Sequence, residues 1–367
     1  RDHADLGGPL VEAAQDAMRR GQRLDIETER LLAALAQRAH QLEAAEQFFR
    51  LCLDGRPGRQ SDFEIYYGLL STLSQEHKPQ EVVALCRRGL KEAPLVNRRL
   101  FHDYLARALA MLGKDDEALA AADQVVDLAG ADTRVAARLF RADILRVVGR
   151  YDKGIAECQA LLQETHDPKE VHDIRYTLSG IYSAARQIAK AEATLRLILE
   201  KEPDDATANN DLGYMLADEG KSLPEAEAMI RKAIRLEREQ RRKGKGVQVG
   251  LDDDQDHAAY LDSLGWVLFR RGQVREGLAQ LKKAAALPDG EDPVIWDHLG
   301  DVYFRLDRLE KARTAWQKAV SLYESAATGR RPDAQYKNIK HKLRLLATNA
   351  RLKSSHAADS ERPGPQR

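Results

Sequence analysis

Apolar residues recur along this chain with the three-to-four-residue spacing of amphipathic helices, and the helices that they predict come in pairs. The first helix of a pair carries a small residue near its centre. The second helix carries a small residue followed, four positions later, by a larger one. This hairpin pattern occurs twice in residues 257–327. The small residues of the two first helices are Gly265 and Gly300, which are 35 positions apart. This stretch sets the register for the rest of the chain.

The small residue of the first helix recurs at a nearly constant interval from residue 25 onward. Its eight positions are Ala33, Gly68, Ala106, Ala142, Ser179, Gly213, Gly265 and Gly300. Six of the seven intervals are 34 to 38 residues long, a period that a globular helical domain has no reason to produce. The second helices supply the pairs Ala45 and Phe49, Ala118 and Ala122, Gly154 and Cys158, Ala191 and Leu195, Ala226 and Ile230, Gly277 and Leu281, and Ala312 and Trp316. A small residue where two helices cross lets their backbones approach, and the bulky residue fills the neighbouring groove.

The sequence pattern of the hairpin resembles that of the tetratricopeptide repeat, which is W-x2-L-G-x2-Y followed by A-x3-F. In the last copy the matching residues are Trp296, Leu299, Gly300, Tyr303, Ala312 and Trp316. The sequences of residues 210–218 and 260–266 look like those of bacterial tetratricopeptide proteins, several of them associated with the cell envelope. The resemblance implies an all-α fold, a right-handed α-solenoid of about eight helix-turn-helix repeats with a C-terminal capping helix.

The pattern also predicts how the chain is divided. The interval from Gly213 to Gly265 is 52 residues long, which indicates an inserted charged loop that contains glycines. We expect its first part to prolong the preceding helix and its glycines to end that helix. The expected segments are 1–22, a linker with a partial repeat or cap helix; 23–236, repeats 1–6; 237–256, the insertion; 257–327, repeats 7–8; 333–348, a capping helix; and 353–367, a disordered tail.

Composition narrows the range of partners. Lys+Arg and Asp+Glu both number 58, so the net charge is zero and gives no general attraction to nucleic acid or a membrane surface. No apolar run approaches the roughly 18 residues of a membrane span. The three cysteines have no paired C-x2-C spacing and are expected to be core residues. Because the chain begins at Arg1 instead of Met, we expect a processed product or a segment of a longer protein. The sequence does not assign a compartment, and its similarity to bacterial repeats favours the cell envelope or the cytoplasm.

Candidate chemistry is sparse. The ten histidines are dispersed, and neither H-E-x-x-H nor G-x-S-x-G occurs. Gly244, Gly246 and Gly250 fit no phosphate-binding spacing. The alternate aspartates from Asp252 to Asp256 lead to His257 where a calcium loop requires glycine. We therefore expect no catalytic site, no cofactor and no metal.

The basic run in the insertion leaves two interpretations open. Arg238, Arg241, Arg242, Lys243 and Lys245 could meet an anionic partner or nucleic acid. They could equally be a solvated helix end, which the absence of interleaved aromatic residues favours.

A second stripe of the first helices is not required by the core. Its residues are Asn210, Tyr214, Asp262, Trp266, Phe269, Asp297, Asp301 and Phe304. In the tetratricopeptide family such positions face the concave groove, so the resemblance implies a partner-binding site there. Aromatic residues beside acids suit a protein or peptide segment with basic residues. The alternative is that Trp266 and Phe269 pack against the next repeat or under the insertion.

The family's clamp for C-terminal carboxylates requires Lys and Asn at these positions. The chain has Asp262, Trp266 and Asp297 instead, so a ligand of that kind is not expected.

These observations favour a non-enzymatic scaffold that binds a peptide or helical segment of a partner in the groove. A second hypothesis is the substrate-recruiting arm of a larger enzyme, such as a kinase or glycosyltransferase, whose catalytic domain lies outside this chain. A third, RNA binding, requires a basic groove, and the acids at the groove positions argue against nucleic acid.

Overall fold

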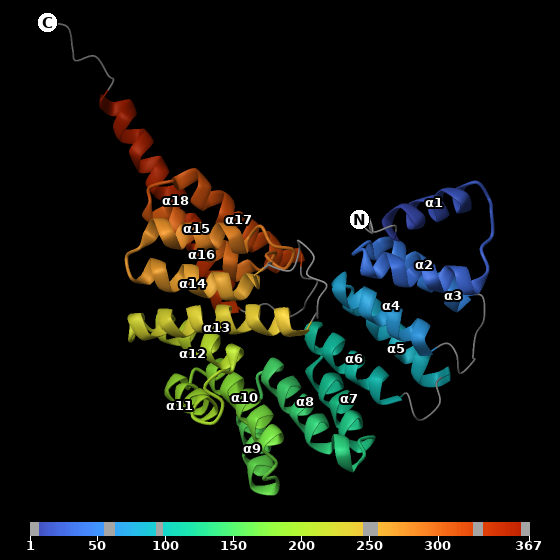
Figure 1. The fold of residues 1–367 in the computed structure, drawn as a ribbon. Helices are drawn as coiled ribbons and strands as arrows, with labels where there is room; N and C mark the ends of the chain where they lie inside the picture. The colour runs from blue at the N-terminus through green and yellow to red at the C-terminus, as the bar shows by residue number, and fades with distance from the viewer. Residues whose placement is uncertain (1–6, 55–62, 93–97, 245–255, 326–332, 361–367) are drawn as a thin grey trace, which may run out of the picture. The chain divides into compact units, whose positions relative to one another are not determined.

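The computed structural model describes residues 7–54, 63–92, 98–244, 256–325 and 333–360. Regular structure in these ranges is helical throughout, without a strand, so the predicted all-α fold is confirmed (Figure 1). The chain divides into two units, with the boundary between Leu161 and Leu162. We call them unit 1 and unit 2 in chain order.

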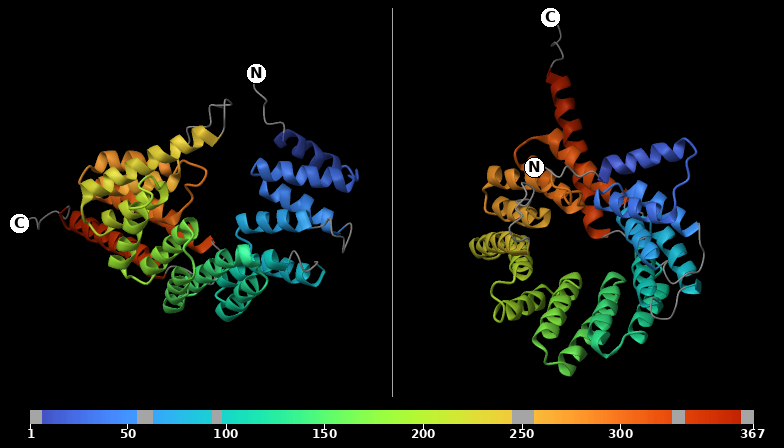
Figure 2. Two further views of the ribbon diagram at one scale, coloured as in Figure 1. Left: turned by 60° about the horizontal axis from the view of Figure 1, so that its bottom comes forward. Right: turned by 45° about the vertical axis from the view of Figure 1, so that its right-hand side comes forward.

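Unit 1 is a series of helices joined by short connections, as two further views also show (Figure 2). Its elements are α1 (Gly7–Arg19), α2 (Ile26–Arg38), α3 (Leu42–Asp54), α4 (Phe63–Gln75), α5 (Pro79–Glu92), α6 (Arg98–Met111), α7 (Asp115–Asp127), the 3₁₀ turn η3 (Ala131–Thr133), α8 (Arg134–Val147) and α9 (Tyr151–Glu164), whose last turn crosses the boundary.

Unit 2 continues the same arrangement. Its elements are α10 (Pro168–Ala184), α11 (Ile188–Leu199), α12 (Ala206–Asp218), α13 (Leu223–Gly244), α14 (Ala258–Arg270), α15 (Val274–Ala284), α16 (Pro293–Arg305), α17 (Leu309–Ser325) and α18 (Asp333–Ser360). The helices α10 and α11, α12 and α13, α14 and α15, and α16 and α17 pack as consecutive pairs. This is the predicted solenoid of helical hairpins.

The turn inside a hairpin needs one residue in the left-handed region. Glycine takes that place at Gly113, Gly149 and Gly272, with φ of 71°, 74° and 82°. Without a Cβ, glycine adopts this conformation freely. Other hairpins use His40, His77, Arg186 and Asp307, with φ of 54° to 59°, and the α12–α13 connection has both Gly220 and Ser222 at positive φ. For these side chains the conformation is strained.

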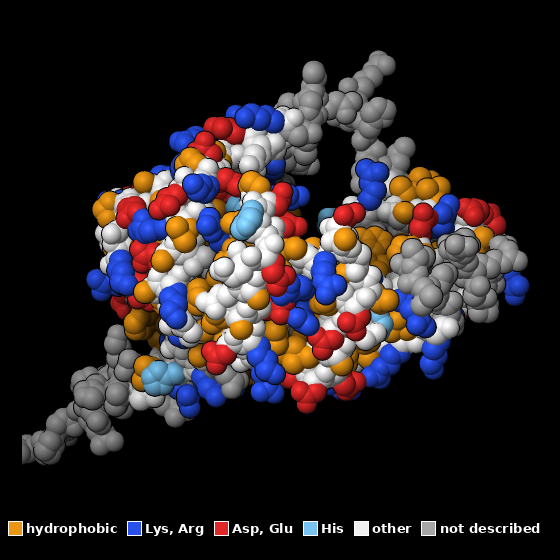
Figure 3. Space-filling view, turned by 90° about the horizontal axis from the view of Figure 1, so that it is seen from below, with side chains coloured by type: hydrophobic (Ala, Val, Ile, Leu, Met, Phe, Trp, Pro, Cys, Tyr) orange, Lys and Arg blue, Asp and Glu red, His pale blue; other side chains and the backbone are white. Residues whose placement is uncertain are grey.

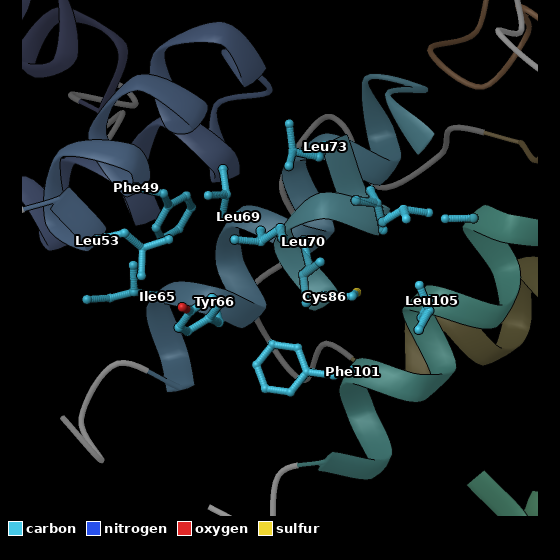
Figure 4. Packing of buried hydrophobic residues seen from close by; sticks show 14 of the residues in the cluster. Phe49, Leu53, Ile65, Tyr66, Leu69, Leu70, Leu73, Cys86, Phe101 and Leu105 are labelled. Carbon is cyan, nitrogen blue, oxygen red and sulfur yellow. The ribbon is translucent and has the colours of Figure 1, made fainter. Parts of the chain in front are cut away.

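The core of unit 1 is built from apolar side chains of successive helices. Phe49 of α3, Leu70 of α4, Cys86 of α5 and Phe101 of α6 belong to one cluster of buried side chains (Figure 4). All three cysteines are buried and unpaired by disulfides, which confirms their interpretation as core residues. Burial raises the pKa of the Cys86 thiol to about 12, so this cysteine stays protonated and unreactive at neutral pH.

The predicted close approach of paired helices is confirmed in unit 2. A Cβ added to Gly300 would lie 2.3 Å from the Trp316 ring, and one added to Gly265 would lie 2.6 Å from Leu281 Cγ. A Cβ on Gly213 would lie 2.7 Å from Ile230. In each pair the bulky residue therefore occupies the space that the missing side chain leaves. In unit 1 Gly68 instead meets Phe49 of the helix before it.

The helix α13 reaches Gly244, so the first part of the insertion prolongs it. The Arg238 guanidinium donates to both carboxylate oxygens of Asp256, at 2.6 and 2.7 Å. Arg241 pairs with Glu237 at 3.1 Å. These intramolecular ion pairs favour the helix-end interpretation for Arg238 and Arg241. Residues 245–255, which hold Lys245, Gly250 and Asp252, lie outside the described residues.

The last helix, α18, extends from Asp333 to Ser360, beyond the predicted end at 348 and into the expected tail. No glycine or proline occurs between these residues, so no helix breaker ends it earlier. Residues 361–367 lie outside the described part. Ile339 and Leu346 of the predicted stripe are 0% and 2% exposed, and α18 packs on α17.

Substituting Gly300 tests the close approach. We expect Gly300→Ala to lower the free energy of unfolding by about 1–3 kcal/mol, because the new methyl group must displace Trp316. Tryptophan fluorescence during urea unfolding measures this in unit 2, since Trp266, Trp296 and Trp316 are the chain's three tryptophans.

Gly180→Ala is the matched control. Gly180 lies inside α10 with nothing within 4 Å of an added Cβ. Alanine there should stabilise the helix by up to about 1 kcal/mol. Equal destabilisation by both substitutions would contradict a role for close helix approach.

Candidate functional site

The eight predicted contact residues lie on three neighbouring helices of unit 2. Asn210 and Tyr214 come from α12, Asp262, Trp266 and Phe269 from α14, and Asp297, Asp301 and Phe304 from α16. The helices α12 and α14 pack together, and so do α14 and α16. The structure therefore places these residues on adjacent helices. We call the set α10, α12, α14, α16 and α18 the first-helix row.

Four helices of the row, α10, α12, α14 and α16, begin at a side chain that caps them. Asp167, Asp205 and Asp292 accept hydrogen bonds from the backbone nitrogens of Glu170, Ala208 and Val294, at 3.0, 2.6 and 2.7 Å. His257 does the same for Ala259 at 3.2 Å. A capping side chain satisfies a backbone donor that the first turn leaves free, which fixes where each helix starts and so its register along the row.

A repeated polar contact joins successive helices of the row. Tyr176 Oη donates to Asp211 at 2.8 Å, and His298 Nδ1 lies 2.8 Å from Asp262 Oδ1. In both cases the first partner stands three positions before the small residue of its helix, which is Ser179 or Gly265. The second partner stands two positions before the small residue of the next helix, which is Gly213 or Gly300. Asp262, which was predicted to face the groove, therefore contacts the next helix of the row.

The row ends in an ion-pair cluster between α16 and α18. Lys342 Nζ lies 2.8 Å from Asp297 Oδ1 and 2.6 Å from Asp301 Oδ1. Burial and then the neighbouring Asp301 charge raise the pKa of Asp297, while Lys342 acts in the opposite direction. Two carboxylates share one ammonium group here, so the cluster keeps a negative charge.

Trp266 and Asp262 are largely covered. They are 8% and 5% exposed, and the Trp266 ring stacks on His298 with 4.1 Å between ring centroids. Of the two arrangements that the sequence left open for Trp266, the structure has the one in which it packs against the next helix of the row. Phe269 is half-buried, 5.3 Å from the Trp266 ring.

The environment of His298 favours its charged form. Burial disfavours the charge, but the charge of Asp262 and its hydrogen bond outweigh that effect, so the pKa of His298 is raised. Burial and the nearby Asp262 charge also raise the pKa of Tyr214. Both side chains are buried, and their contact together with the direction of this shift favours an ion pair between Asp262 and His298.

Two polar atoms in the same region have no partner among the described residues. They are the Asn210 carbonyl oxygen and the Trp266 indole nitrogen, both buried. Each such atom costs about 1–3 kcal/mol when it stays unpaired. By contrast, Phe304 is 46% exposed, the most accessible of the eight predicted residues.

One cluster has the composition of a cation site. His172 Nε2 lies 2.9 Å from Asp205 Oδ2 and 4.0 Å from Glu202. Burial lowers the pKa of His172, but hydrogen bonds to Asp205 and Asp173 outweigh it and raise the pKa overall. A metal needs the neutral imidazole. The arrangement therefore favours an ion pair that joins α10 to the start of α12.

Sequence reasoning missed the partners within the row. His298, Tyr176, Asp211 and Lys342 were not predicted as contacts of the groove positions. For Tyr176, Asp211 and His298, the signal that could have revealed them is the spacing of 35 or 36 residues between an acid and its polar partner, which is about one repeat. Lys342 lies 45 and 41 residues from its two acids, so this spacing does not mark it.

These features define the class of protein: helical hairpins of fixed period whose first helices form a continuous row. Family models described as tetratricopeptide repeat match residues 177–240 and 293–326. The chain therefore contains tetratricopeptide repeats, which these models place at the matched residues. The number of eight repeats stays a prediction, because the matches cover only these residues.

A curated relative is a TPR repeat-containing protein of Pseudomonas aeruginosa, 31% identical over 144 residues. The match covers 39% of this chain and 21% of that protein's length. It therefore relates the chain to part of a longer bacterial protein.

Two solved structures show the same fold. Yeast Tom70 has a TM-score of 0.59 at 16% identity, over 93% of this chain and 68% of that chain. The Cut9–Hcn1 hetero-tetramer of the APC/C has a TM-score of 0.50 at 14% identity, over 86% of this chain and 54% of that chain. At these identities the likeness concerns the fold alone.

A search of the described helices for a membrane span found none that is both long and apolar enough.

Removing the charge of Asp262 tests the buried pair. Below about pH 6.5, the unperturbed value, His298 is charged in both the folded and the unfolded chain. Its raised pKa therefore gives a stabilisation that is full at low pH and is lost as the pH rises through the folded-state value. We expect Asp262→Asn to lower the free energy of unfolding by up to about 3 kcal/mol at pH 6, and by less at higher pH.

The measurement is urea unfolding by tryptophan fluorescence from pH 5.5 to 8.5, taken as the difference from wild type. The difference is needed because other histidines also titrate: His172 with a raised pKa and His102 with a lowered one. Asp218→Asn, an exposed change at the end of α12, is the control and should give a small, pH-independent difference. A flat profile for Asp262→Asn would contradict the ion pair.

Proposed function

We propose that this chain is a non-enzymatic scaffold that binds an extended or helical segment of a partner protein along the first-helix row of unit 2. Tetratricopeptide repeats as a class support protein–protein interaction. The row offers a continuous face of five helices held in register by capping residues and polar contacts. Such a preorganised face loses little conformational entropy when a partner binds.

The observation that carries the proposal is the pairing of exposed apolar side chains with the acidic cluster at the end of the row. Phe304 follows Asp301 by three residues and is 46% exposed, and Leu345 follows Lys342 by three residues and is 52% exposed. Residues three apart lie one above the other on a helix. Each apolar side chain therefore lies one turn beyond the charged cluster on its own helix.

This arrangement fits a partner segment with apolar anchors and at least one basic residue. Large apolar side chains dominate binding energy when a partner covers them. The charge left on Asp297 and Asp301 after pairing with Lys342 attracts a lysine or arginine and orients the segment. A basic peptide is therefore a better match than nucleic acid.

The predicted contacts thus divide by role. Asp262 and Trp266 hold α14 to α16 through His298, and we assign them to support of the row. Phe304, with Asp297 and Asp301, forms the binding surface, and Leu345 joins it. Over the face in Figure 3, basic and acidic side chains are interspersed without a wide area of one sign, as expected for zero net charge.

Replacing both exposed apolar residues tests the proposal. We expect Phe304→Ser with Leu345→Ser to reduce capture of a native partner about tenfold or more, because the anchors are lost. Because both side chains are exposed, the free energy of unfolding should change by less than about 1 kcal/mol. Quantitative affinity capture with the full chain as bait measures the first effect, and urea unfolding measures the second.

The control is Leu128→Ser with Leu197→Ser, which changes two exposed leucines outside the row. This variant should capture the partner as the wild type does. Equal capture by all three proteins, or equal loss by both variants, would contradict the proposal.

A further inference from the structure

The helix α18 has the register of one more first helix. Its buried residues Ile339 and Leu346 stand 44 positions after Ile295 and Val302 of α16, which are buried in the same way. Lys342, 44 positions after His298, continues the polar contact along the row by reaching Asp297 and Asp301. Its position is therefore that of a first helix, and α17 is the second helix that precedes it.

In the preceding hairpins a second helix covers the outer side of the first. Leu299 of α16 is 3% exposed, and Gly300 lies so close to Trp316 of α17 that an added Cβ would come within 2.3 Å. In α18 the corresponding residues are Leu343 and Arg344. No second helix follows α18 within the described residues, and Arg344 is exposed.

The uncovered side forms a notch of about 510 Å³ between α17 and α18. Its apolar lining comes from Val320 of α17 and from Tyr336, Leu343 and Ala347 of α18. These α18 residues recur at intervals of seven and four, so they form one stripe along the helix. A stripe of this kind is what an amphipathic helix packs against.

The rim of the notch is basic. Lys340 and Arg344 line it one turn apart and are exposed, and no acidic side chain is among the lining residues. Lys340 Nζ lies 3.2 Å from Tyr336 Oη, and it also lies over that ring, 5.0 Å from its centroid. Tyr336 Oη donates in turn to Glu324, so one acid lies near Lys340. The exposed Lys340 and Arg344 charges can still meet an occupant from outside.

Arg344 further limits the occupant. It stands where Gly300 allows close backbone approach in α16, so a helix cannot dock as closely here as α17 does on α16. A carboxylate that meets the guanidinium makes a charge-assisted hydrogen bond at the longer distance. A purely apolar helix would leave Arg344 covered and unpaired, which is unfavourable.

We propose that the notch between α17 and α18 binds an acidic amphipathic helix of a partner protein, which completes the open hairpin as its second helix. The helix places an apolar stripe on Leu343 and Val320 and its carboxylates on Lys340 and Arg344. This surface differs from the binding surface proposed on the first-helix row, which uses Phe304 and Leu345.

Two synthetic helices test the proposal with the full chain. Both are fluorescein-labelled 18-residue peptides with the same leucine and alanine stripe; one has glutamates and the other lysines on the flanks of the stripe. Fluorescence anisotropy should show saturable binding of the acidic peptide, with at least tenfold weaker binding of the basic one. Equal binding of the two peptides, or no binding of the acidic one, would overturn the proposal.

Charge reversal locates the binding site. Lys340→Glu with Arg344→Glu should weaken the acidic peptide at least tenfold and strengthen the basic one. Arg305→Glu, an exposed charge change at the end of α16 outside the notch, is the control and should leave binding unchanged. Equal effects of the two variants would overturn the assignment to the notch.

Two further outcomes separate this proposal from its alternatives. The variant Phe304→Ser with Leu345→Ser should bind the acidic peptide normally, so failure of the first-helix row as a binding surface would leave this result intact. If sedimentation shows that the chain alone self-associates, Arg344→Glu should not abolish that self-association. If it does, a second copy fills the notch, and the proposal is wrong.

Discussion

The structure depends on the distance at which two helices of a hairpin can pack. Gly213, Gly265 and Gly300 let the backbones approach so closely that an added Cβ would lie 2.3 to 2.7 Å from the side chain opposite. Ile230, Leu281 and Trp316 then fill the remaining space. A hairpin of two closely packed helices has too little interior to bury its own apolar surface, so it must stack on neighbouring hairpins. The row of first helices, and any surface on it, follows from that stacking.

Stacking alone would leave the first helices free to slide along one another, and polar contacts restrict this. Tyr176 with Asp211, Asp262 with His298, and Lys342 with Asp297 and Asp301 each join one helix of the row to the next. A hydrogen bond between buried polar groups is geometrically demanding and costly to leave unmade. These contacts therefore fix the relative register of the helices, while apolar packing provides most of the stability.

The sequence was sufficient for the fold because the fold is local and repeated. The interval between small residues predicted the hairpins, and the pairs of small and bulky residues predicted which side chains meet. Each of these depends on neighbours within about 35 residues. The long α18 was predicted to end too early, because residues 353–367 have the composition of a disordered tail, although no glycine or proline occurs in residues 333–360.

The site was harder to predict than the fold. A helical stripe identifies which residues share a face, and all eight predicted residues do lie on neighbouring helices. It does not reveal whether the next helix covers that face. Asp262 and Trp266 became covered because His298 came from one repeat away, whereas Phe304 stayed exposed. Only the three-dimensional structure separates these outcomes, since all three residues occupy positions of the same stripe in the sequence.

The left-handed residues of the hairpin turns have a consequence for tolerance to heat. An L-residue in that conformation stores roughly 1–2 kcal/mol of strain relative to glycine, and His40, His77, Arg186 and Asp307 all adopt it. His40, His77 and Arg186 lie in turns outside the helices α16, α17 and α18 that carry both proposed binding surfaces, whereas the Asp307 backbone N–H donates to the Phe304 carbonyl. Glycine substitutions in these turns would therefore raise the free energy of unfolding, because they remove backbone strain, without changing the side chains that the helices present to a partner.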